Sequence, residues 1–207
     1  MTAEDDFFEP WVEPDYLGDD EPVEQDVPWM RPDHVAGVVV PLDLDLYRGP
    51  DVVLRLTSVT AYRRGLELTF GTWRRPGSRR APTDRARWAP DDARIGIRLA
   101  DGTRLGHESP FAARPETTAG TWTQLMGSGG PLRSDRTWWL HPVPDDDHLE
   151  VVVAWAEQRV PETATRLDLR PLREAAAREE VLWDPPPAIG STGGGWFGYA
   201  GPMPDGP

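Results

Sequence analysis

The sequence contains no cysteine, no lysine and no long apolar run. The absence of cysteine excludes a disulfide-stabilised scaffold, a cysteine-ligated zinc finger and catalysis by a thiol. No run of about 18 apolar residues exists, so we expect no membrane-spanning helix. All 22 basic residues are arginine. A GC-rich genome explains that bias more simply than a selected phosphate-binding role does.

The length of 207 residues is enough for one domain with a substantial core. The first 30 residues are acidic, whereas a secretory signal begins with positive charge and has an apolar centre. We therefore expect a cytoplasmic protein.

The net charge of −13 is concentrated at the N-terminus. Residues 1–33, the acidic leader, hold 12 of the 35 acidic residues and one arginine, so the leader carries −11 and the remainder −2. Self-repulsion and frequent proline predict a disordered acidic tail over residues 1–34. Its aromatic residues leave two interpretations open, a solubility tail or a segment that docks on a basic surface. Residues 185–207, rich in glycine and proline, are predicted to form a second disordered tail.

From about residue 36, apolar and polar residues alternate as they do in β-strands. In residues 52–62 the even-numbered positions are expected to share one face of a strand. In residues 66–70 the shared positions are Leu66, Leu68 and Phe70. Between these strands, Gly65 is able to take the left-handed conformation that a short hairpin needs.

Further strands are predicted at residues 94–99, 103–105, 137–141 and 148–155, with a weaker candidate at 162–169. Asp101-Gly102 is a favoured turn pair. In the strand at residues 148–155 we expect burial of Leu149, Val151, Val153 and Trp155. One helix is predicted over residues 171–183, begun by Asp168 and Pro171, with Leu172, Ala176, Leu182 and Trp183 near one side. The fold class is therefore mainly β. We predict an antiparallel β-sandwich domain over residues 35–184 with one C-terminal helix.

Residues 74–87, the arginine-rich loop, are the most basic part of the sequence. Their six arginines stand against the single acidic residue Asp84, and they are Arg74, Arg75, Arg79, Arg80, Arg85 and Arg87. Guanidinium groups bind carboxylates and phosphates through two oxygens at once. The anionic chain opposes approach to nucleic acid. Three interpretations stay open: a solvated loop, a site for an acidic protein partner, and an intramolecular site for the acidic leader.

Motifs for catalysis and cofactors are weak. The glycines of residues 127–130 do not form a phosphate loop, because no lysine follows and the next segment is predicted to be a strand. No cofactor is expected. The densest cluster of potential metal ligands is His141, Asp145, Asp146, Asp147 and His148. It is either a solvated turn or, if a hairpin gathers these side chains, a metal site.

The sequence has ten tryptophans. Adjacent Trp138 and Trp139 must point to opposite faces of a sheet, so one is predicted in the core. The other either packs under the helix or is exposed for binding, as on a carbohydrate-binding face. Trp196 and Phe197 lie in the glycine-rich tail, where they form either a docking peptide or an arm that folds back on the domain.

Several segments are similar to those of a group of uncharacterised proteins from high-GC actinobacteria. The segments are LMGSGGPLRSDRTWWLHPVP, LEVVVAW, VPET, LDLRPLREAA and VLW. The resemblance covers roughly residues 35–184 and implies one compact unit of bacterial origin. It implies no activity, and no catalytic residue is carried over from it.

We hypothesise a non-enzymatic protein-interaction module that uses the arginine-rich loop, an exposed sheet face and Trp196 and Phe197. The alternatives are a small metal-binding hydrolase at residues 141–148 and a carbohydrate-binding β-sandwich.

Overall fold

The structure is a computed structural model, and it describes residues 26, 27, 29–78, 93–106 and 120–185. Most of the two predicted tails lies outside this part of the chain. So do six of the predicted binding residues, which are Arg79, Arg80, Arg85, Arg87, Trp196 and Phe197.

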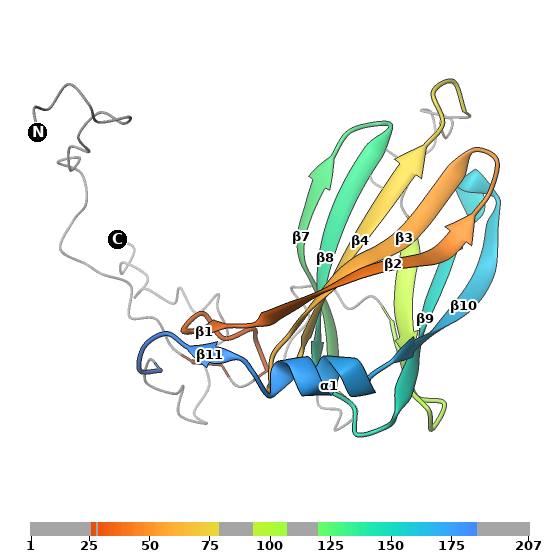
Figure 1. The fold of residues 1–207 in the computed structure, drawn as a ribbon. Helices are drawn as coiled ribbons and strands as arrows, with labels where there is room; N and C mark the ends of the chain where they lie inside the picture. Colours follow the sequence, from red (N-terminus) through yellow and green to blue (C-terminus); the bar gives the residue numbers. More distant parts are fainter. Residues whose placement is uncertain (1–25, 28, 79–92, 107–119, 186–207) are drawn as a thin grey trace, which may run out of the picture.

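The described chain is mainly β, as predicted, and its main body consists of two antiparallel sheets packed face to face (Figure 1). The five-stranded sheet has the order β2 (Val38–Arg48), β3 (Val52–Ala61), β4 (Leu66–Arg74), β8 (Arg133–His141) and β7 (Thr121–Gly129). The four-stranded sheet has the order β10 (Val160–Asp168), β9 (His148–Trp155), β5 (Arg94–Arg98) and β6 (Arg104–Leu105). The predicted β-sandwich is thereby confirmed.

One apolar core fills the space between the two sheets. Leu66, Leu68 and Phe70 of β4 are buried, as their alternation predicted. All four predicted positions of β9 are buried with them, from Leu149 to Trp155. Burial of these apolar side chains is the principal force that holds the two layers together.

The prediction that the even-numbered residues of β3 share one face is wrong beyond Leu56. The pairing of β3 with β4 changes register between Leu56 and Ser58. Because this bulge at Thr57 adds one residue, Val59 and Ala61 point into the core with no exposed surface. The Thr57 hydroxyl donates to the carbonyl of Thr69 at 3.0 Å, on the partner strand.

The glycine-rich residues 127–130 are not a loop that leads into β8. Gly127, Ser128 and Gly129 are the last residues of β7 and pair with Arg136, Asp135 and Ser134 of β8. Neither β7 nor the long strand β2 was predicted as a separate strand. In β7 the glycine and polar residues weaken the alternating pattern, whereas residues 42–46 of β2 do alternate apolar and acidic residues.

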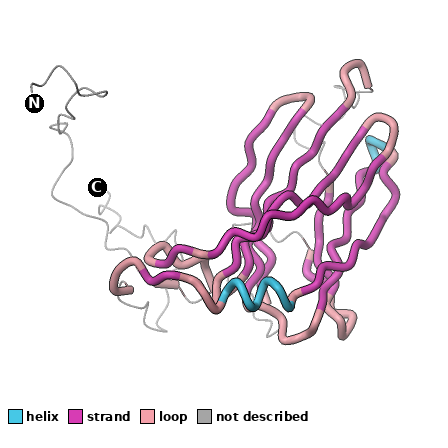
Figure 2. Tube along the Cα trace, viewed as in Figure 1, coloured by secondary structure: helices cyan, strands magenta, loops and turns pink. Residues whose placement is uncertain are grey.

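The helix prediction is correct at its start and wrong at its end. Helix α1 spans Arg170–Ala176, and the Asp168 carboxylate accepts a hydrogen bond of 2.9 Å from the backbone N–H of Arg170. The chain then turns, and β11 (Glu180–Val181) pairs with β1 (Val35–Ala36) in a small separate sheet (Figure 2). Consequently Trp183, predicted to lie on one side of the helix with Leu172 and Ala176, is outside the helix and has 64% of its surface exposed.

The two hairpins expected from turn residues differ in their use of glycine. Gly102 has a φ of 88°, so the Asp101-Gly102 turn uses the left-handed conformation as predicted. Gly65 does not have a positive φ, so the left-handed conformation predicted for it is wrong. The carbonyl of Leu140 and the indole of Trp139 instead pack where a Cβ of residue 65 would stand.

None of the helices in the described ranges has the length and apolar character needed to cross a lipid bilayer.

Candidate protein-binding surface

The two arginines of the predicted binding set that the structure describes lie at one end of the sandwich. Arg74 ends β4, and its guanidinium stands 4.3 Å from the centre of the Trp155 ring. Arg75 is exposed and beyond the strand, and its backbone N–H donates to the carbonyl of Asp51 at 2.8 Å. The stacked contact of Arg74 brings the end of β4 against the end of β9 on the opposite sheet.

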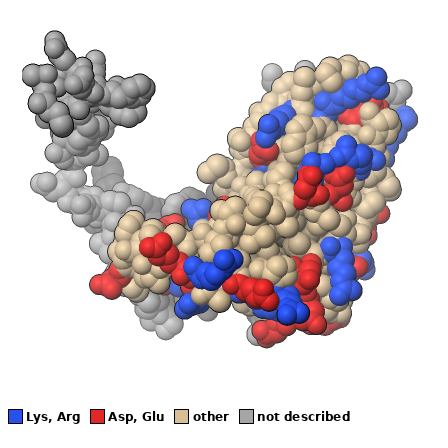
Figure 3. All heavy atoms as spheres, viewed as in Figure 1, with Lys and Arg blue, Asp and Glu red and all other residues tan. Residues whose placement is uncertain are grey.

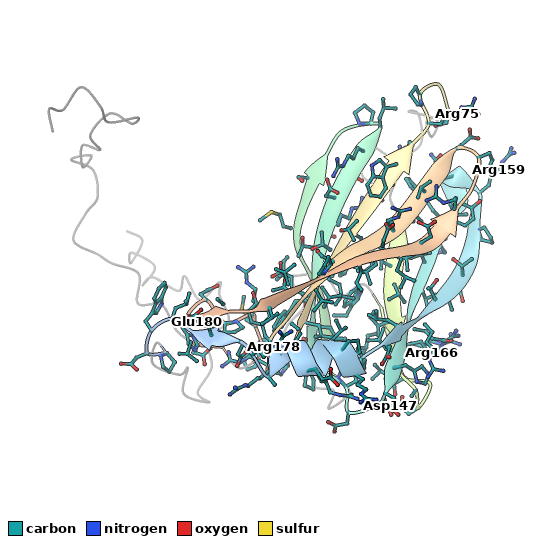
Figure 4. All side chains as sticks on the ribbon, in the orientation of Figure 1. Arg75, Asp147, Arg159, Arg166, Arg178 and Glu180 are labelled. Carbon is teal, nitrogen blue, oxygen red and sulfur yellow. The ribbon has the colours of Figure 1, made fainter. Side chains whose placement is uncertain are left out.

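Two further arginines, which the sequence did not indicate, lie at this end. The guanidinium of Arg133, the first residue of β8, lies 5.5 Å from the centre of the Trp73 ring. Arg159 follows the short 3₁₀ helix η2 (Ala156–Gln158), is exposed and has a left-handed backbone with a φ of 56°. Figure 4 places Arg159 at the same end of the molecule as Arg75. We call Arg74, Arg75, Arg133 and Arg159 the basic end.

A shallow hollow of about 230 Å³ lies beside Arg75. Residues 49–53, which connect β2 and β3, form one wall, and residues 73–75 form the other. The acidic groups close to these arginines include Asp51 in the wall of the hollow and Asp135, whose carboxylate lies 3.3 Å from Arg133. Arg75 and Arg159 have no such ion pair within the described residues, so their guanidinium groups are available to carboxylates from outside.

The candidate metal ligands between residues 141 and 148 do not come together in a hairpin. Residue His141 ends β8 in one sheet and His148 begins β9 in the other, so the intervening residues cross between the sheets. The Nδ1 of His141 donates to the carbonyl of Arg64 at 2.8 Å, and burial lowers the pKa of His141. The carboxylate of Asp147 lies 3.4 Å from Arg173 of α1.

Across the described ranges, no group of three or more histidine, aspartate or glutamate side chains is arranged to hold a metal ion. A hollow of about 290 Å³ does exist near Asp147, lined also by Arg166, Asp168 and Arg170. Its lining alternates positive and negative charge, which favours neither an anion nor a cation.

The paired tryptophans point to opposite faces, as predicted, but the second is covered in an unexpected way. Trp138 stacks on Trp122 in the core, with ring centres 5.0 Å apart. Trp139 is 1% exposed on the outer face of the five-stranded sheet, and its indole Nε1 donates to the carbonyl of Trp29 at 2.9 Å. Neither predicted alternative, packing under the helix or exposure for binding, describes Trp139. Residues before β1 cover it.

This covering segment, residues 26, 27 and 29–34, is called the N-terminal latch. The Asp26 carboxylate accepts two hydrogen bonds from the Arg64 guanidinium, at 2.5 and 2.7 Å. Arg31 forms an ion pair of 2.9 Å with Glu67 of β4. Opposite charges thus hold the end of the acidic leader on the sheet, at a place separate from the basic end.

We expect acid to release the latch. The hydrogen bond from Arg64 holds the pKa of Asp26 below its ordinary value of 3.8. Because the pKa of Asp26 is lower in the folded state, the pair with Arg64 stabilises the latch fully above about pH 4. This stabilisation is lost as the pH falls through the lower, folded-state pKa. The protection of the Trp139 indole N–H against hydrogen exchange, followed by NMR during an acid titration, should fall in that range.

The variant Asp26→Asn removes the titrating group, so the indole N–H should already be weakly protected at neutral pH. Asp145→Asn is the matched control, because Asp145 is exposed and lies outside the latch, and it should leave the protection of Trp139 unchanged. Equal protection of Trp139 in the wild type and in Asp26→Asn would contradict the role given to the Asp26–Arg64 pair.

No protein family model matches this chain, and no curated protein or solved structure matches it either.

Proposed function

We propose that this protein is a non-enzymatic, cytoplasmic interaction module whose basic end binds an acidic segment of a partner protein. The observation that carries the proposal is the pair of exposed arginines, Arg75 and Arg159, that approach from different sheets at one end of the sandwich. A guanidinium offers a planar fork of donors that matches a carboxylate. The neighbouring Arg74 and Arg133 lie on tryptophan rings.

The chemistry of the surface favours a protein partner. The lining of the hollow beside Arg75 includes Trp73, the apolar Val52 and Val53, and the charged Asp51 and Arg75. Acidic segments with spaced aromatic residues present complementary groups, and the acidic leader of this chain has that composition. The acidic leader would therefore either compete with the partner for the basic end or resemble in composition the segment that the partner binds with. Nucleic acid fits poorly, because the net charge of −13 opposes its approach.

Figure 3 shows basic and acidic residues interspersed over the visible face of the domain, with blue spheres prominent toward the upper end. A surface of mixed sign suits a selective protein contact, since complementary charges increase the association rate and misplaced like charges reject other partners.

We expect the full chain to bind a labelled synthetic peptide with the sequence of residues 4–16, measured by fluorescence anisotropy. The double variant Arg75→Ala/Arg159→Ala should raise Kd by roughly fivefold to tenfold, because two exposed ion pairs near the middle of the usual range contribute roughly 0.5–0.7 kcal/mol each. Binding of the wild type should also weaken as the salt concentration rises, because exposed charges are screened.

The matched control is Arg166→Ala/Arg178→Ala, which removes the same charge from exposed residues away from the basic end (Figure 4). It should change Kd by less than about twofold. An equal loss in both double variants would mean that binding follows net charge alone, and the basic end would then have no specific role.

A further inference from the structure

Strand β7 forms an open edge of the five-stranded sheet. It is the last strand in the sheet order, and in the described part of the chain it pairs with β8 alone. From Leu125 onward all its residues are exposed, and Met126 has 68% of its surface accessible. An open edge presents backbone N–H and C=O groups to any other strand that approaches.

The other strand edges carry features that discourage such pairing. Strand β2 has Pro41, Asp43 and Asp45 along its length, and it lies against β10, where the Thr163 hydroxyl donates to the carbonyl of Leu46 at 3.2 Å. Strand β10 contains a proline and three charged residues, and β6 has only two residues. Charges, proline and short length are the usual protection of an edge strand.

Strand β7 has none of these three features, and its one protective feature is an irregularity of register between Gln124 and Met126. Its nine residues, TWTQLMGSG, include no charge and no proline. Next to it, Leu132 in the turn to β8 is 47% exposed, so apolar surface continues beyond the strand. A long, uncharged and partly apolar edge in a native protein indicates that the edge is normally paired.

We propose that β7 pairs antiparallel with β7 of a second copy of this chain, so that the two five-stranded sheets join into one. A two-fold axis near Leu125 places the glycine-rich half of each strand, Met126–Gly129, opposite the bulkier half, Thr121–Gln124, of the other. The irregular register of β7 lies between Gln124 and Met126, so it coincides with the axis and leaves both halves extended. The strand is therefore complementary to itself.

Charge also favours a second copy as the occupant. In a symmetric pair a charge near the axis lies close to the same charge of the other copy, and neighbouring like charges destabilise strand pairing. A strand without charge avoids that penalty. Residues 34–207 carry a net charge of only −2, so the domains themselves repel one another weakly.

The oligomeric state of the full chain tests this pairing. Light scattering coupled to size-exclusion chromatography should give, with increasing concentration, about twice the chain mass of 23.1 kDa. Met126→Glu brings two carboxylates toward the axis and should raise the dimer Kd at least about tenfold. Val39→Glu is the matched control, because Val39 is 63% exposed on β2, and it should leave the dimer unchanged.

The cysteine-free sequence gives a second measurement that also reports the register. Opposed residues in an antiparallel pair have Cα atoms about 4.5–5.5 Å apart, within the range of about 4.4–6.8 Å that a disulfide spans. Under mild oxidation, Leu125→Cys should therefore give a covalent dimer. Val39→Cys should stay monomeric on a denaturing gel.

A wild type that is monomeric at every concentration overturns the proposal and would leave a partner strand from another protein as the occupant. A dimer that withstands Met126→Glu and gives no disulfide in Leu125→Cys also overturns it. Neither result affects the peptide binding expected at the basic end, because that assay depends on Arg75 and Arg159.

Discussion

Replacing Trp122 with alanine is expected to lower the free energy of unfolding by about 3–5 kcal/mol, the largest effect of any single change considered for this protein. Trp122 is fully buried, its ring stacks on Trp138, and it makes a T-shaped contact with Phe70 whose ring centre is 6.2 Å away. Its indole N–H donates to the carbonyl of Ile95 at 3.1 Å, across to the other sheet. Alanine would leave both a large cavity and a buried carbonyl without its donor.

Urea unfolding followed by circular dichroism measures this loss. Trp183→Ala is the control, since it removes the same side chain from an exposed position and should change stability by less than about 0.5 kcal/mol. A loss for Trp183→Ala as large as that for Trp122→Ala would show that the segment after α1, rather than the space between the sheets, dominates stability.

Replacing Gly65 with alanine is the second large expected effect, a loss of about 2–3 kcal/mol through overpacking. A Cβ at residue 65 would stand 2.5 Å from the Leu140 carbonyl oxygen and 2.5 Å from the Trp139 ring. Both neighbours are fixed, because Leu140 belongs to the sheet and Trp139 is clamped between the sheet and the N-terminal latch. Relief of the clash therefore requires the hairpin or the latch to move.

Gly106→Ala is the matched control, because nothing lies within 4 Å of a Cβ there and Gly106 is not among the described glycines with positive φ. It should be neutral, or stabilising by about 0.4–1 kcal/mol, since alanine reduces the freedom of the unfolded chain. Urea midpoints of the two variants against wild type provide the comparison. A Gly65→Ala midpoint equal to that of Gly106→Ala would mean that Trp139 has room to shift.

The two proposed surfaces use different parts of the sandwich. The basic end is assembled from strand ends and connections, where side chains from both sheets converge. The β7 edge depends on backbone groups that the sheet leaves unpaired. A dimer through β7 would present two copies of the basic end, so a partner with two acidic segments would bind more tightly than a partner with one.

Much of the fold could be predicted from the sequence, because alternation is a property of neighbours along the chain. The buried positions of β4 and β9 and the start of α1 at Asp168 and Pro171 all follow from local pattern. The candidate site was predicted only in part. Arg74 and Arg75 stand out in a basic stretch, whereas Arg133 and Arg159 are far from it in sequence and join it only in space.

The remaining features depend on contacts between distant residues. Opposite the bulge at Thr57, β4 supplies the paired carbonyl of Thr69, and no local signal in β3 marks the change of face. The short helix ends because β11 pairs with β1, more than a hundred residues earlier in the chain. Trp139 is buried because the N-terminal latch covers it.

The sequence alone therefore determined which residues alternate in strands, where charge is concentrated and which chemistries lack their residues. Tertiary structure decided which face each strand segment buries, what covers Trp139 and which arginines share a surface. The physical reason is that local backbone preference acts over a few residues. Burial and ion pairing, in contrast, reward any two groups that the fold brings together, however far apart they are in the chain.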